Sequence, residues 1–112
     1  MIDVVLKIKN KKIIGYEVSG HALFAEAGKD IVCAAVTILS FNVVDTMTDV
    51  LKLSEKMNYE IKENSLSLNI EPRLLTSDEL HDTQVVLRGF EIGVRSLLQN
   101  YSDYISLYYR EV

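Results

Sequence analysis

The stretch from Ile31 to about Met57 contains no proline and no glycine, and its apolar residues recur at helical spacing. In its first half, apolar side chains occupy almost every face, because Ile31, Ala34, Ile38 and Phe41 lie outside the main stripe. A helix that is apolar on more than one face must be buried on more than one side. A small sheet covers one side only. This stretch therefore implies a second helix and leaves room for a second subunit.

Five other segments alternate apolar and polar residues, with the period of two that is typical of half-buried strands. They are residues 2–9, 14–20, 59–62, 65–70 and 105–109. The first two flank Asn10-Lys11-Lys12 and the next two flank Glu63-Asn64, so each pair predicts an antiparallel hairpin. The last segment is rich in tyrosine and predicts either a sheet edge or a subunit contact.

A second long helix is predicted in the C-terminal half of the chain. Thr76 and Glu79 have the spacing of a capping box, in which each side chain binds the backbone N–H of the other residue. Apolar residues then recur at helical spacing over residues 86–101. Gly89 and Gly93 within this stretch predict close contact with another helix; the alternative is only a propensity cost of roughly 1 kcal/mol each.

In chain order these elements are strand, strand, helix, strand, strand, helix and strand, in a single domain over residues 1–112. Two long helices packed on one face of a mixed, mainly antiparallel sheet would bury all the predicted apolar faces, so the expected fold class is α+β. The apolar share of 48% and the charged share of 25% are ordinary for a globular domain of this kind.

The net charge of −4 argues against broad binding of nucleic acid, which needs a concentrated basic surface. Lys7, Lys9, Lys11 and Lys12 form the one basic cluster of the sequence. Contact with ribosomal RNA is one explanation of this cluster, and a solvated hairpin at a sheet edge is the favoured one. We therefore expect no direct binding of nucleic acid.

The cysteine content and hydropathy indicate a cellular compartment. The single cysteine cannot form an internal disulfide. The sequence shows no N-terminal apolar signal segment, and no unbroken apolar run approaches the roughly 20 residues of a membrane span. These features predict a protein of the reducing cytoplasm that has no membrane partner.

The one cysteine, Cys33, has two features nearby that turn a thiol into a nucleophile. Asp30 precedes the long apolar segment and predicts a helix N-cap, which places Cys33 in the first helical turn, where the helix dipole stabilises negative charge. His21 lies twelve residues before Cys33, and the loop 22–29 allows its imidazole to fold over the thiol. The alternatives are a buried structural cysteine and a structural histidine. His81, the other histidine, is expected to be exposed and not catalytic.

Gly20-His21-Ala22, a short loop carrying Gly28, and the run Asp30–Ala35 together resemble the signature of the ribosomal-processing cysteine protease family known as Prp. The resemblance extends to chain length and element order, so it covers essentially the whole chain. It implies a homodimeric cysteine endopeptidase that removes a short N-terminal extension from the twenty-seventh large-subunit ribosomal protein during ribosome maturation. It also implies an apolar groove near Cys33, because that extension ends in an apolar, phenylalanine-containing sequence. We expect neither a cofactor nor a metal.

In this interpretation Cys33 is the nucleophile, and His21 activates the thiol and hands its proton to the leaving amine. Two neighbours support them. Gly20 supplies a sharp backbone turn before His21, or merely ends a strand. Asp30 either orients His21 or caps the helix that carries Cys33, and capping is the favoured role.

Leu23, Phe24 and Gly28 are expected in a mobile flap that closes over the substrate; packing of Leu23 and Phe24 on the core is the alternative. Thr37 follows Cys33 by one helical turn, at a position where the family often carries serine. It is a further candidate for supporting the site, unless its hydroxyl only bonds a helix carbonyl. Two hypotheses compete with catalysis: a ribosome-associated binding protein with a structural Cys33, and a redox role, which the absence of a second, resolving cysteine weakens.

Overall fold

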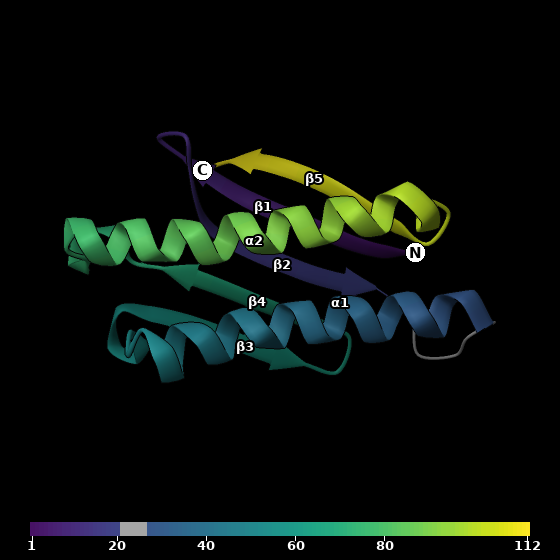
Figure 1. The fold of residues 1–112 in the computed structure, drawn as a ribbon, viewed down its shortest axis with the longest axis horizontal. Helices are drawn as coiled ribbons and strands as arrows, with labels where there is room; N and C mark the ends of the chain where they lie inside the picture. The colour runs from purple at the N-terminus through teal and green to yellow at the C-terminus, as the bar shows by residue number, and fades with distance from the viewer. Residues whose placement is uncertain (21–26) are drawn as a thin grey trace.

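The computed structural model describes the backbone of residues 1–20 and 27–112, and the side chains of residues 1–20 and 31–112. Within these residues, the strands form one sheet in the order β3-β4-β2-β1-β5. The strands are β1 (Ile2–Lys9), β2 (Lys12–Gly20), β3 (Met57–Lys62), β4 (Ser65–Ile70) and β5 (Ile105–Glu111). The long helices are α1 (Ala27–Asp45) and α2 (Ser77–Tyr101), and the short ones are η1 (Thr46–Val50, π-helical), η2 (Ser54–Lys56) and η3 (Pro72–Leu74). Both long helices lie over the same face of the sheet (Figure 1).

The strand pairing follows from the two hairpins and the return of the chain through α2. β1 pairs with β2, β2 with β4, and β3 with β4, all antiparallel, while β5 pairs with β1 in parallel. Asn10 and Lys11 adopt left-handed φ angles of 51° and 65°, as a tight hairpin turn requires. β5 lies at a sheet edge, as one of the two explanations of its tyrosines predicted. The expected α+β class and element order are confirmed.

The first long helix ends earlier than the sequence predicts. α1 passes into the π-helical turn η1 and stops there, so a continuous helix to about Met57 was wrong. Lys52 adopts a left-handed φ of 57°, and the Leu53 N–H donates to the Met47 carbonyl at 3.0 Å, which turns the chain out of the helix. The Leu53 side chain is buried in the core. Packing of this residue, rather than a glycine or proline, accompanies the end of the helix.

The start of α2 confirms the predicted capping box. The Glu79 N–H donates to the Thr76 hydroxyl at 3.1 Å, and the Thr76 N–H donates to the Glu79 carboxylate at 2.9 Å. Lys56 donates to the same carboxylate at 2.8 Å and so joins α2 to the segment before β3. The bond from Lys56 and then that from Thr76 lower the pKa of Glu79, because they favour its charged form.

Tyr16 on β2 connects the sheet to both long helices. Its hydroxyl donates to the Ser40 carbonyl in α1 at 2.8 Å, and its ring packs on Phe90 of α2 with the ring centroids 4.6 Å apart. The Ser40 hydroxyl in turn donates to the Val36 carbonyl at 2.6 Å. Burial raises the pKa of Tyr16 far above its usual range, so the hydroxyl remains a hydrogen-bond donor.

The two glycines of α2 have different surroundings. A Cβ at Gly93 would lie 2.9 Å from Leu39 Cδ2 of α1, which confirms the predicted close contact at this position. A Cβ at Gly89 would meet nothing within 4 Å, so the same prediction was wrong for Gly89. Residues four apart are rotated by about 40° around a helix, and this rotation leaves Gly89 on the exposed side of α2.

One stretch, Ile31–Val50, is long and apolar enough to cross a membrane by length and composition, with a mean hydropathy of 1.7. The core helix of a globular domain passes the same test. Val32, Val36 and Val43 of this stretch lie in the hydrophobic core formed with the sheet and α2. These contacts are those of a core helix.

Candidate active site

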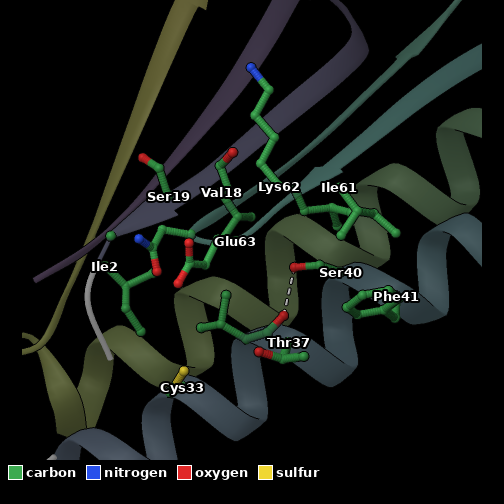
Figure 2. A pocket seen from close by; sticks show the side chains of 15 residues that line it. Ile2, Val18, Ser19, Cys33, Thr37, Ser40, Phe41, Ile61, Lys62 and Glu63 are labelled. Atoms are coloured by element: carbon green, nitrogen blue, oxygen red, sulfur yellow. Dashed lines mark hydrogen bonds between the residues drawn. The ribbon is translucent and has the colours of Figure 1, made fainter. Parts of the chain in front are cut away.

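Cys33 borders a cavity of about 280 Å³ between α1 and one end of the sheet (Figure 2). The lining comes from four separate parts of the chain: the start of β1, the end of β2, the middle of α1 and the β3–β4 hairpin. Most of it is apolar, with Ile2, Val36 and Leu66 among the buried residues beneath the cavity. Cys33 itself is half-buried. The thiol therefore stands beside an apolar space that opens to solvent.

The position of Cys33 within α1 corrects the sequence prediction. α1 begins at Ala27, so Asp30 is a helical residue and not the N-cap, and Cys33 lies in the second turn rather than the first. The prediction took the last short polar side chain before the apolar run as the cap, whereas the helix continues backwards through Gly28. The dipole effect falls off beyond the first turn. The helix dipole consequently acts less strongly on Cys33 than the sequence predicted.

Gly20 ends β2 beside the same cavity, in a conformation that requires glycine. Its φ is +125°, and a Cβ there would lie 2.3 Å from the Met1 carbonyl oxygen. Its N–H donates to the Asn64 carbonyl in the β3–β4 turn at 3.2 Å. Gly20 thus ends the strand, which was one of the two roles that the sequence suggested, and its positive φ is one that other residues adopt only with strain.

The structure describes one of the two histidines, His81, and the residue that precedes the other. His21 lies outside the described residues, but it directly follows Gly20, which lines the cavity together with Cys33. Gly20, the residue before His21, and Cys33 therefore border the same cavity. His81, near the start of α2, has a side chain that is 76% exposed and 3.5 Å from Asp82, which confirms its expected exposure.

Part of the predicted flap is helical. Gly28 belongs to α1, so its assignment to a mobile flap was wrong. Leu23 and Phe24 lie outside the described residues. A glycine in a helix lowers its stability but does not interrupt it, which is why Gly28 was a poor marker of a loop.

Thr37 lines the cavity one turn after Cys33 and is exposed to it. Among the described residues, the Thr37 hydroxyl makes no hydrogen bond to a helix carbonyl, which was the alternative role, whereas Ser40 bonds the Val36 carbonyl. Thr37 therefore remains available to the cavity.

The β3–β4 hairpin is the part of the site that sequence reasoning missed. Ile61, Glu63 and Asn64 line the cavity, as does Phe41 on α1 (Figure 2). No local motif marks these residues. The available signal was topological, because a hairpin that pairs with β2 brings its turn to the end of β2, next to Gly20.

A half-buried thiol at an apolar cavity, with a histidine joined to another wall of that cavity, is the arrangement of a thiol hydrolase. Comparison with known proteins also indicates a thiol hydrolase. The family model for cysteine protease Prp matches residues 1–106, and the chain belongs to this family. It is accordingly a cysteine protease.

Individual relatives cover nearly the whole chain. The ribosomal processing cysteine protease Prp of Bacillus subtilis is 30% identical over an alignment of 100 residues, which covers 84% of this chain and 83% of that protein. Among solved structures, SMU.848 from Streptococcus mutans has a TM-score of 0.85 at 21% identity and covers 100% of this chain and 99% of its own. The S. aureus ribosomal processing protease Prp, solved in complex with a substrate peptide, has a TM-score of 0.78 at 19% identity, covering 98% of this chain and 100% of its own. These two structures share the fold of this chain.

Replacement of Gly20 by alanine tests whether the backbone conformation at this residue, which we call the backbone anchor, is needed for stability and activity. We expect Gly20→Ala to lower the free energy of unfolding by about 1–3 kcal/mol, because of its positive φ and the nearby Met1 carbonyl, and to reduce proteolysis. Urea denaturation followed by circular dichroism measures the first effect. The matched control is Gly89→Ala, where a Cβ meets open space and helix propensity predicts a gain of up to about 1 kcal/mol. Equal stability of Gly20→Ala and the wild type would contradict the anchor.

Proposed function

We propose that this protein is the endopeptidase that removes the short N-terminal extension of the twenty-seventh large-subunit ribosomal protein during ribosome maturation. The observation that carries the proposal is the shared cavity, with Cys33 on one wall and Gly20, to which His21 is joined, on another. The name of the Bacillus subtilis relative, ribosomal processing cysteine protease, supports a ribosomal protein as the substrate. The activity belongs to the cytoplasm, where a single thiol stays reduced.

Peptide hydrolysis proceeds in two steps through a thioester. His21 takes the proton of the Cys33 thiol, and Sγ attacks the carbonyl carbon of the peptide bond. The carbon–nitrogen bond then breaks, and His21 gives its proton to the departing amine. In the second step His21 takes a proton from water, the hydroxide attacks the thioester, and the carboxylate product leaves as the thiol is restored.

Backbone N–H groups stabilise the oxyanion that forms in each step, by about 3 kcal/mol per donor. The first four N–H groups of an α-helix have no partner within the helix. In α1 these include the N–H groups of residues 27–29, more than one turn before Cys33. They are the backbone donors of the helix start that we assign to the oxyanion. Because Asp30 is not the N-cap, orientation of His21 is the remaining role for its carboxylate.

The partner that the outer face of α1 suggests is a second copy of this chain. Ile31 and Ile38 are 57% and 68% exposed on this face, and Ala34 lies between them. Apolar side chains grouped in this way mark protein interfaces. The homodimer implied by the family resemblance would cover them.

A charge on this face tests the dimer. We expect the wild type to sediment as a dimer and Ile38→Glu as a monomer, because the carboxylate would have to be buried without a partner. The control is Tyr108→Glu, which adds the same charge at a 54% exposed position on the other face of the sheet. A dimer that is unchanged by Ile38→Glu, or lost equally in both variants, would contradict this interface.

Cleavage of the precursor tests the proposed function. The extended ribosomal protein is incubated with the wild type or with Cys33→Ala, and mass spectrometry follows its mass. We expect loss of one defined N-terminal peptide with the wild type and an intact precursor with Cys33→Ala, because the variant has no nucleophile. An intact precursor in both reactions, with the protein folded and reduced, would favour a ribosome-associated binding protein instead.

Alkylation of the thiol tests its activation by His21. Iodoacetamide should modify Cys33 of the wild type rapidly at pH 7, and His21→Ala should slow the reaction about tenfold, since less thiolate is present. Asp30→Asn should slow it to a smaller extent, if its charge orients the imidazole. His81→Ala is the matched control, because His81 is exposed on α2 away from the cavity. Slow alkylation at equal rates in all four proteins would indicate a structural cysteine.

A further inference from the structure

We propose that the β3–β4 hairpin is one wall of the substrate site, and that Ile61 on this wall selects a large apolar side chain of the peptide that Cys33 cleaves. The proposal deepens the proposed function and rests on it. It adds a specificity residue on an edge strand, in a part of the chain that carries neither the nucleophile nor the histidine.

Two walls face each other across the cavity. Cys33, Thr37 and Phe41 follow one another at intervals of four residues, so they lie along one flank of α1. Ile61 and Glu63 line the opposite wall, on the β3–β4 hairpin (Figure 2). The cavity therefore offers a peptide whose carbonyl carbon reaches Cys33 a space for one of its side chains between the helix and the hairpin.

The space between the walls fits one large apolar side chain. Its floor is formed by apolar residues of the sheet and helix, among them Val18, Val36 and Leu66. The volume of about 280 Å³ exceeds that of cavities of about 150 Å³ that bind benzene. An aromatic or long aliphatic side chain would gain contacts on all sides, whereas a small side chain would leave most of the space unfilled.

Ile61 is placed to contact such a side chain. β3 is the last strand on its side of the sheet, and Ile61 pairs in register with the buried Leu66 of β4, so both side chains point toward the helices. Ile61 is nevertheless 52% exposed. Figure 2 shows Ile61 near Phe41, at the end of the cavity away from Cys33. An exposed branched apolar side chain on the wall of a cavity is a surface that a bound apolar group would cover.

The hairpin wall is fixed relative to the catalytic residues. The ladder between β3 and β4 runs from Met57 to Lys62 without a register shift, and the Asn64 carbonyl accepts the Gly20 N–H at 3.2 Å. The hairpin turn and the residue before His21 are therefore held together by the backbone. A wall held in this way binds without the cost of ordering a mobile loop.

Ile61→Asp tests the proposal, with Tyr59→Asp as the matched control. Tyr59 lies on the same strand and the same face and is 49% exposed, but it does not line the cavity. With the ribosomal precursor as substrate, we expect Ile61→Asp to raise KM about tenfold and to change kcat less than about threefold, because the lost contact serves binding rather than the chemical step. Tyr59→Asp should leave both parameters within about twofold of the wild type.

A second arm uses the substrate. Once mass spectrometry has located the cleaved bond, the large apolar residues near it in the precursor are replaced by alanine, one at a time. One of these replacements should cost the wild type about tenfold in kcat/KM and should cost Ile61→Asp much less, since the two changes remove the same contact.

The outcomes separate this proposal from the proposed function. Equal effects of Ile61→Asp and Tyr59→Asp, or independent effects of the enzyme and substrate changes, would overturn the role of Ile61 while cleavage by Cys33 stands. A precursor that the wild type leaves intact, or that Cys33→Ala still cleaves, would overturn the proposed function and this inference with it. Circular dichroism of each variant shows whether the fold is retained.

Discussion

The hydrogen bond from the Tyr16 hydroxyl to the Ser40 carbonyl joins the helix that carries the nucleophile to the centre of the sheet. It is buried, and an unpaired buried hydroxyl would cost about 1–3 kcal/mol, so the helix has a strong preference for this position. Ser40 and its hydrogen-bond partner Val36 both line the cavity beside Cys33. The hydrogen bond that positions α1 on the sheet thus also positions residues of one wall of the site.

Local patterns in the sequence were sufficient for most of the fold. The alternation in residues 65–70 and the Thr76 and Glu79 pair act through near neighbours, and both appear in the structure as expected. The α+β class followed from the same patterns, since two apolar helices need one sheet face to cover them. The motif containing Cys33 identified the family because few other sequences combine these residue types in so short a span.

The ends of the first long helix and the third wall of the site could not be predicted from local sequence patterns. Asp30 and the glycine at position 28 looked like a helix start and a loop, but the helix extends past both. At its other end the buried Leu53 and the left-handed Lys52 mark the end of the helix without any residue type that signals one. Ile61 became part of the site only through the pairing of β4 with β2, which places residues distant in sequence beside Gly20.

The contact between Gly20 and the Met1 carbonyl has a practical consequence for handling the protein. Ile2 lines the cavity, so residues added before Met1, such as an affinity tag, would extend from the edge of the cavity and compete for the peptide-binding space. The other terminus is a safer point of attachment. β5 runs parallel to β1, and Val112 donates to the Ile8 carbonyl at the far end of the sheet (Figure 1). A fusion at the C-terminus would leave the entrance to the cavity open.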